Sequence, residues 1–252
     1  MRSIIFVLLT IASFSGLAVG ADERYVTVST LSAPEAHQAA AADDSFVYAI
    51  SSTAVAKYDR TTGALVARST GKAKHLNSGF LWEGKLYCAH SNFPQKPEKS
   101  EVMVLDPGSM EITEFKNFGE YRGSLTWAVQ EGRFWWCNFA HYGEENGKTV
   151  LVKLDAEWRE LGTWTYPAEV VRRLGKSSIS GGIWHKGHLL VTGHDRKEIY
   201  RLQLPAQGSV LELLQTLPSP YPGQGIAADP KTGGLVGIDR GKKQVIFAEL
   251  RE

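Results

Sequence analysis

The chain carries a short pattern in which apolar and polar residues alternate and an apolar residue is followed by an acid. The pattern is clearest at 149–155, recurs at 54–59 and 102–106, and returns in weaker form at 199–203 and 245–249. Its closing positions are 59, 106, 155, 203 and 249, so the steps between them are 47, 49, 48 and 46 residues. Self-similarity at a fixed period of about 40 to 50 residues predicts a repeat architecture.

Each repeat is interpreted as four short β-strands joined by turns. Residues that turns favour, such as Asp, Gly, Thr and Pro, separate the alternating segments, for example at 59–63 and 106–108. The first strand of each repeat is expected at 37–42, 78–82, 125–129, 182–184 and 225–228. In a ring of such sheets these first strands line the central axis, which is where their polar side chains would meet.

The fifth repeat ends after its third strand, whereas a spare strand is expected at Tyr25–Ser29, before the first repeat. An N-terminal strand that completes the last sheet removes a free edge and closes a ring. The sequence therefore predicts an all-β fold, a five-bladed β-propeller of four-stranded antiparallel blades, as a single domain over 21–252. The alternative is a six-bladed ring. Its extra blade would fall in 167–180, a segment too short for four strands, which we expect to form one helical turn or a lid.

Composition and charge narrow the location and the partners. Residues 1–20 have the pattern of a signal peptide, with Arg2 before an apolar run and Ala18-Val19-Gly20 before the expected cleavage. No later segment is long enough to span a membrane. With 28 basic and 27 acidic residues, the net charge of +1 gives no electrostatic footprint for nucleic acid. We expect an exported protein, periplasmic or extracellular, that is a monomer and binds a small molecule or a carbohydrate.

The only two cysteines, Cys88 and Cys137, fall on corresponding strands of neighbouring repeats. An exported protein permits a disulfide. Packed sheets lie about 10 Å apart, whereas a disulfide needs Cα atoms within about 7 Å of each other. Two buried free thiols and one bridge are therefore both left open.

The longer predicted connections open on one face of the ring, and long loops on a rigid scaffold commonly carry function. Five of the seven histidines map to this face, and only His185 and His188 map to the other. The chemistry is assigned to four residues that could serve as general acids and bases: His194, Asp195, His90 and His37. Polar residues near the strand ends are expected to bind the ligand: Gln38, His75, Asn77, Asn92, Ser124, Thr126, Asn138, His141, Gln224, Asp239 and Arg240.

Two classes of function fit this face. The first is an enzyme of lyase or cyclase type, in which Arg240 holds an anionic group of a small molecule. A divalent metal is an option within this class, with His37, His75 and His90 as its candidate ligands, although no local spacing typical of a metal motif is present. A glycosidase is disfavoured because no pair of acids lies in the first strands. The second class is a binding module without chemistry, supported by aromatic residues such as Phe93 and Tyr142.

At the level of the whole predicted fold, the chain resembles exported bacterial propellers of the YncE-like group, which repeat an apolar–x–apolar–Asp strand and turn. It is also similar to the glutamine cyclotransferase family of five-bladed propellers in its length, its signal peptide and its closing stretch from Gly225 to Asp239. The resemblance implies a cyclase-like activity. That family carries an acidic residue in its first inner strand, where this chain has His37-Gln38-Ala39, so no catalytic residue is carried over.

Overall fold

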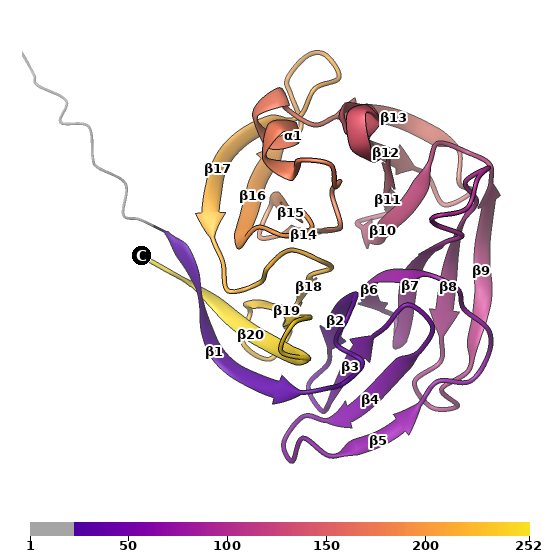
Figure 1. The fold of residues 1–252 in the computed structure, drawn as a ribbon, viewed down its shortest axis with the longest axis vertical. Helices are drawn as coiled ribbons and strands as arrows, with labels where there is room; N and C mark the ends of the chain where they lie inside the picture. The colour runs from indigo at the N-terminus through magenta and orange to yellow at the C-terminus, as the bar shows by residue number, and fades with distance from the viewer. Residues whose placement is uncertain (1–22) are drawn as a thin grey trace, which may run out of the picture.

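The computed structural model describes residues 23–252 and shows five four-stranded antiparallel sheets arranged around one axis (Figure 1). The predicted five-bladed propeller is thus confirmed. The predicted signal peptide at 1–20 lies outside the described residues. None of the helices in 23–252 is long and apolar enough to cross a membrane.

In blades one to four, each sheet keeps the order of its strands in the sequence, from the axis outward. Blade one contains β2 (Ala39–Ala42), β3 (Phe46–Ile50), β4 (Val55–Asp59) and β5 (Leu65–Arg68). Blade two contains β6 (Leu76–Trp82), β7 (Lys85–Ser91), β8 (Ser100–Leu105) and β9 (Ile112–Gly119). Blade three contains β10 (Ser124–Glu131), β11 (Phe134–Ala140), β12 (Val150–Leu154) and β13 (Glu160–Thr165). Blade four contains β14 (Gly181–His185), β15 (His188–Thr192), β16 (Glu198–Gln203) and β17 (Glu212–Pro218).

Blade five closes the ring with a strand from the other end of the chain. Its three C-terminal strands are β18 (Ala227–Ala228), β19 (Leu235–Asp239) and β20 (Gln244–Arg251). The outer strand β1 (Arg24–Ser32) pairs antiparallel with β20, from Arg24 opposite Arg251 to Ser32 opposite Gln244. This is the closure that the spare N-terminal strand predicted, and it leaves β20 without a free edge.

A buried ion pair reinforces the joint between blades one and five. Arg60, in the turn after β4, bonds to the carboxylate of Asp229, in the turn after β18, at 2.7 Å. The two side chains are 8% and 0% exposed. Burial alone would raise the pKa of Asp229, but its hydrogen bonds to Arg60 and Thr232 hold that pKa below its usual range. Separating the two side chains would leave a buried charge without a partner, so this pair holds blades one and five together.

The segments that lead into the inner strands of blades five, one and two approach each other closely at the axis. A Cβ atom added to Gly225 would lie 2.6 Å from the Cβ of Ala39 and 3.1 Å from the Cα of Ser78, so blades five, one and two meet there. The Gly225 amide also donates to the Gln38 carbonyl at 2.9 Å. Alanine occupies every position of β2, which gives the same close approach. Small side chains on these strands are therefore a condition of the five-bladed ring.

The two cysteines belong to the packed interior of neighbouring blades. Cys88 on β7 and Cys137 on β11 are both buried and free. Burial raises the pKa of the Cys88 thiol to about 12 and raises that of Cys137 as well. Of the two alternatives that the sequence left open, the structure has the free thiols, which pack as small apolar side chains.

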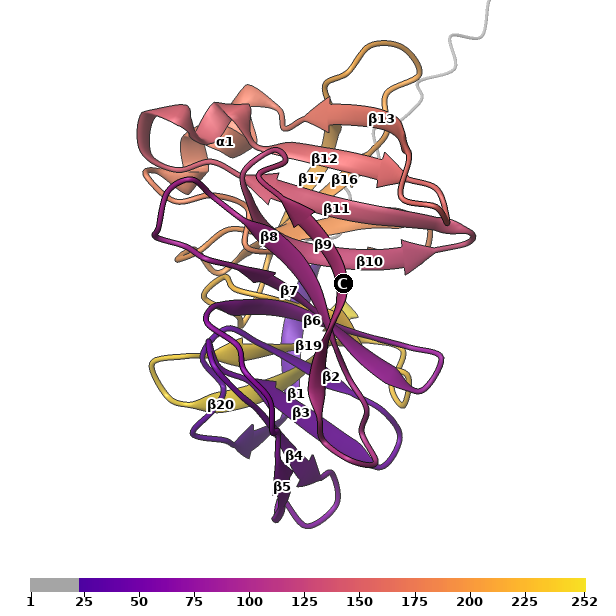
Figure 2. The same ribbon diagram turned by 90° about the vertical axis from the view of Figure 1, so that its right-hand side faces the viewer.

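Most of the longer connections gather on one face, here called the loop face. It comprises the connections that enter the inner strands and those that join the second strand of each blade to the third. In the side view of Figure 2, α1 (Ala168–Leu174) lies on this face, and the short turns after β6 and β10 lie on the opposite side. A 3₁₀ helix, η1 (Gly143–Lys148), joins β11 to β12 on the same face. The expected helical turn in 167–180 is α1.

Close packing between blades three and four gives a direct test of the core. A Cβ atom added to Gly182 on β14 would lie 2.3 Å from the Trp127 ring, and Trp127 is fully buried. We expect Gly182→Ala to lower the free energy of unfolding by about 1–3 kcal/mol, because the ring has no room to move. Gly147→Ala is the control, since a Cβ there has no neighbour closer than 3.9 Å. Equal denaturant midpoints for the two variants would contradict the packing described here.

Candidate functional site

The loop face holds all five histidines that the sequence assigned to it, but they fall into separate groups. His37 and His75 lie in the connections that enter β2 and β6, and His90 lies on β7 near its end. His141 follows β11 directly, and His194 lies two residues after the end of β15. His185 and His188 flank the short turn between β14 and β15, on the opposite face.

His194 is the centre of the first group, and both of its ring nitrogens have a partner. Its Nδ1 lies 2.7 Å from Oδ1 of Asp195. Its Nε2 lies 3.0 Å from Nη1 of Arg240, which comes from the connection between β19 and β20. A guanidinium group can only donate, so Nε2 accepts and Nδ1 carries the proton that bonds Asp195. The imidazole is therefore held as the neutral Nδ1–H tautomer, with the Nε2 lone pair facing Arg240.

The backbone around His194 is fixed by the segment that leads into blade five. Gln224 has a left-handed backbone, with φ of 72°, and its amide donates to the Gly193 carbonyl at 2.9 Å. Its side chain donates to the His194 carbonyl at 3.1 Å. A Cβ on Gly223 would lie 2.5 Å from the His194 backbone, so only glycine fits this approach. Non-glycine residues in the left-handed region are often found at functional sites.

Arg240 is oriented by the turn in which it lies. Asp239, at the end of β19, accepts the Lys242 amide at 3.1 Å and lies 3.6 Å from the Lys242 ammonium. These contacts fix the connection between β19 and β20. Of the predicted residues, His194, Asp195, Gln224, Asp239 and Arg240 are thus brought together, where blades four and five meet.

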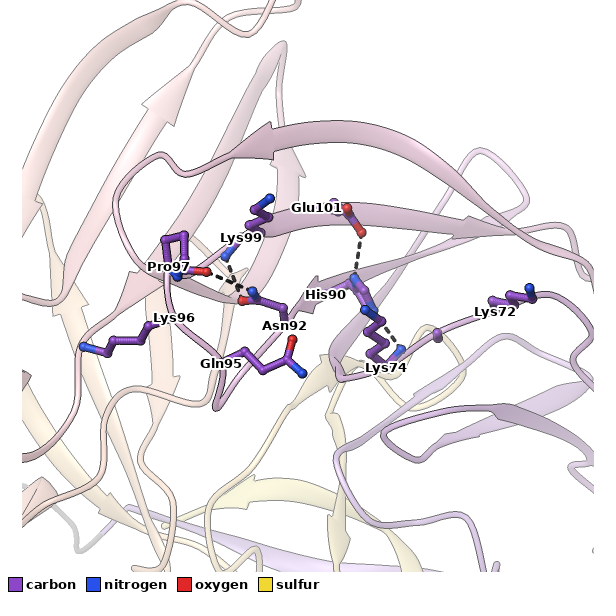
Figure 3. A pocket seen from close by; sticks show the side chains of 10 residues that line it. Lys72, Lys74, His90, Asn92, Gln95, Lys96, Pro97, Lys99 and Glu101 are labelled. Atoms are coloured by element: carbon purple, nitrogen blue, oxygen red, sulfur yellow. Dashed lines mark hydrogen bonds and ion pairs between the residues drawn. The ribbon is translucent and has the colours of Figure 1, made fainter.

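His90 belongs to a second group, on blade two (Figure 3). Its Nδ1 lies 2.8 Å from Oε2 of Glu101, which is its cross-strand partner on β8. Its Nε2 accepts the backbone amide of Lys74 at 2.9 Å. The side chain is only 9% exposed. Burial lowers the pKa of His90 below its usual range, although Glu101 acts in the opposite direction. This imidazole pins the 69–75 connection to blade two.

His37 and His75 lie between these two groups. Burial lowers the pKa of His75, and the nearby charges of His90 and His37 lower it further. Burial also lowers the pKa of the more exposed His37, with help from Arg240 and Lys243. Both imidazoles are thus disposed to stay neutral. Within residues 23–252, no group of three or more His, Cys, Asp or Glu side chains lies close enough together to hold a metal ion.

Several predicted ligand-binding residues connect one blade to the next instead of meeting in one axial pocket. The Asn77 side chain donates to the Leu125 carbonyl at 2.9 Å. The Thr126 hydroxyl donates to the Ile179 carbonyl at 2.8 Å and accepts from Asn138 at 2.8 Å. All three of these side chains are at least nine-tenths buried. The hydrogen bonds of their polar atoms therefore hold blades two, three and four together.

The remaining predicted residues organise loops. Ser124 donates to the Ser91 hydroxyl at 2.9 Å, and Gln38 donates to the Ser52 hydroxyl at 2.9 Å. His141 bonds through Nε2 to the Arg122 carbonyl at 2.9 Å, which makes Nε2 its protonated nitrogen. Glu101, the partner of His90, was not among the residues predicted from the sequence. The pairing of the strands around 85–90 and 101–105 carried the signal, because it sets position 90 opposite position 101.

Comparison with known proteins identifies the fold and no family. No family model matches the chain, and no curated protein does. Among solved structures, Myxococcus xanthus glutaminyl cyclase superposes with a TM-score of 0.64 at 10% identity, covering 90% of this chain and 97% of that one. The β-propeller domain of Myceliophteria thermophila Cps50 (Swd1) gives a TM-score of 0.51 at 10% identity, covering 90% of this chain and all of that one. This chain has the β-propeller fold of both, and the first agrees with the resemblance noted from the sequence.

The histidines give a pH dependence of stability. Folding lowers the pKa of His90, so the unfolded chain binds more protons below pH about 6.5. The contribution of neutral His90 to the free energy of unfolding is complete above that pH. It is lost as the pH falls from about 6.5 through the lower pKa of the folded protein. We expect the stability lost on acidification to be smaller in His90→Gln, by up to about 1.4 kcal/mol per pH unit. Urea unfolding between pH 7.5 and 5.5 measures this, and a wild-type-to-variant difference independent of pH would contradict it.

Proposed function

We propose that this protein is an exported propeller that performs acid–base chemistry, of lyase or cyclase type, on a small anionic molecule at its loop face. The observation that carries the proposal is the Asp195–His194–Arg240 arrangement, with distances of 2.7 and 3.0 Å. His194 is the general base, Asp195 orients it, and Arg240 binds an anionic group of the substrate.

The hydrogen bonds around His194 explain how a substrate would activate it. In the free protein, the Arg240 guanidinium donates a hydrogen bond to the Nε2 lone pair of His194. A carboxylate or other oxyanion binds a guanidinium group more strongly than a neutral imidazole does, because the hydrogen bonds are charge-assisted on both sides. An anionic substrate that engages Arg240 therefore frees Nε2 to accept a proton. Asp195, bonded to Nδ1–H, stabilises the imidazolium that forms and holds its orientation.

A cavity beside His194 provides room for a substrate. It has a volume of about 350 Å³ and lies between the C-terminal end of α1 and the 193–196 connection. His194 and Asp195 both line it, together with Lys176 and Ser177, whereas Arg240 lies beyond the lining, on the Nε2 side of His194. This size is within the range of about 300–1,000 Å³ that is usual for small-molecule sites. His37 is the second titratable group that we assign to the reaction, and burial and the charge of Arg240 lower its pKa. His90 positions the 69–75 connection through its bond to the Lys74 amide.

The likeness to glutaminyl cyclase supports a cyclase-type reaction but specifies no substrate. At 10% identity it is a likeness of fold. A peptide that begins with glutamine is therefore one probe, assayed by the ammonia released when the amine displaces the side-chain amide. A uronic-acid disaccharide is a second probe, because elimination from it leaves an unsaturated product that absorbs ultraviolet light.

Substitutions at His194 and Arg240 test the roles proposed for them. For the probe that is turned over, we expect His194→Gln to lower kcat by about 10²–10⁴, the usual contribution of a general base. We expect Arg240→Gln to act mainly by raising KM, because it removes binding of the anionic group. His188→Gln, on the opposite face, is the control. Full activity of His194→Gln in a folded protein would exclude His194 as the base.

A second candidate function is carbohydrate binding without chemistry, and a row of aromatic rings favours it. Phe93, in the connection between β7 and β8, packs against His75 with ring centroids 5.5 Å apart and against Tyr142 at 4.7 Å. All three side chains are half-buried at the loop face. Rings of this kind offer apolar faces on which a sugar ring can pack.

This alternative makes a separate prediction. Phe93→Ala is expected to weaken binding of a neutral oligosaccharide by roughly tenfold, about 1.4 kcal/mol, measured by calorimetric titration. Phe115→Ala, which removes a ring 42% exposed on the outer strand β9, is the control. The ligand would be recovered unchanged after incubation. Equal affinities of the two variants would rule out the aromatic row as the binding surface.

A further inference from the structure

A cavity on blade two, separate from the His194 site, is surrounded by lysines. Its volume is about 570 Å³, and it lies between the connection that enters β6 and the connection from β7 to β8. Figure 3 shows Lys72 and Lys74 coming from the first connection, and Lys96 and Lys99 from the second. The amides of Asn92 and Gln95 lie between them in the same view. Each connection thus contributes two lysines to the lining of the same hollow, with Lys72 and Lys96 on opposite sides of it in this view.

The lysines of this cavity are poorly compensated by acids. Its single lining carboxylate, Glu101, is bonded to His90 at 2.8 Å and to Asn117 at 3.1 Å. Lys99 approaches Glu120 only at 4.0 Å, with both side chains more than half exposed, so this contact contributes little. Among the ion pairs of residues 23–252, none involves Lys72, Lys74 or Lys96. Like charges gathered at one hollow favour the binding of an anion.

The connection that carries Lys72 and Lys74 is held in place from both ends. The backbone amide of Thr70 donates to the Met110 carbonyl at 2.8 Å, and the Thr70 carbonyl accepts from the Ile112 amide at 3.0 Å. These two bonds hold the connection against the start of β9. A Cβ on Gly71 would lie 2.4 Å from the Ile112 carbonyl oxygen, so only glycine fits there. At the other end, the Lys74 amide donates to His90. This side of the cavity is therefore formed before any ligand arrives.

The opposite side of the cavity is organised by Asn92. Its Nδ2 donates to the Pro97 carbonyl at 2.9 Å, and its Oδ1 accepts the Lys99 amide at 2.8 Å. The backbone amide of Gln95 donates to the Asn92 carbonyl at 3.0 Å. One side chain thus closes the loop that carries Lys96 and Lys99. A preformed site loses less conformational entropy on binding than a mobile one.

We propose that this cavity binds a small organic molecule that carries a phosphate or sulfate ester, through Lys72, Lys74, Lys96 and Lys99. Lysine is suited to such groups as a mobile point charge with three donors. A volume of about 570 Å³ accommodates a molecule of the size of a sugar ester and not only a lone ion. The site does not depend on the reaction proposed for His194, because neither His194, Asp195 nor Arg240 lines it.

Calorimetric titration at low ionic strength tests the proposal with three probes: glucose 6-phosphate, glucose 6-sulfate and glucose. We expect saturable binding of at least one ester with a Kd below about 1 mM and no binding of glucose. Binding of the phosphate alone or of the sulfate alone identifies the ester, and binding of both shows recognition of the shared oxyanion. The absence of ester binding, or equal binding of glucose, would overturn the proposal.

Paired variants separate the cavity from the overall charge of the protein. Lys72→Gln/Lys74→Gln and Lys96→Gln/Lys99→Gln are each expected to weaken ester binding by about tenfold or more, because two short-range contacts are lost. Lys72→Arg/Lys74→Arg keeps the charges and is expected to retain binding. The control Lys85→Gln/Lys231→Gln removes the same charge near short turns on the opposite face, where screening leaves an effect of about twofold at most. A control that weakens binding as much as the cavity variants would contradict the site.

Discussion

The closing of five sheets around one axis is the constraint on which the rest of this structure depends. A ring of only five blades brings the inner strands into backbone contact, and the chain meets this requirement with small residues. All four positions of β2 are alanine, and Gly225 touches blades one and two at the axis. The ring is then fastened by β1 against β20 and by the buried Arg60–Asp229 pair. Each blade is held by contacts with its two neighbours as well as by its own strands.

This close approach determines where binding and chemistry can occur. Side chains at the ends of the inner strands, such as Asn77 and Thr126, are buried and hydrogen-bonded to the next blade. The accessible polar groups lie further out, on the loop face. One set surrounds His194, where blades four and five meet, and another surrounds the lysine-lined cavity of blade two. The ring holds these two sites apart, on different blades.

The strands and their order followed from the sequence because they depend on local patterns. The alternation at 149–155 predicted β12, and the missing last strand of the fifth repeat predicted the role of β1. The candidate site was predicted in part. Asp195 is adjacent to His194 in the chain, but the contact between His194 and Arg240 joins residues 46 apart and depends on how blades four and five meet. The inner-strand residues were expected to form one pocket, because no local pattern shows that their partners are the carbonyls of the neighbouring blade.

The measurement that tests the central claim most directly is the tautomer of each histidine, from long-range proton–nitrogen correlation spectra at pH about 8.5, where imidazoles are neutral. Arg240 can only donate to Nε2 of His194, so we expect the Nδ1–H form for His194. His141, which must donate from Nε2 to a carbonyl, provides the opposite form as an internal reference. Spectra with this contrast would support His194 as a base held ready by Arg240. An Nε2–H form at His194 would contradict it, because the lone pair assigned to the reaction would already carry a proton.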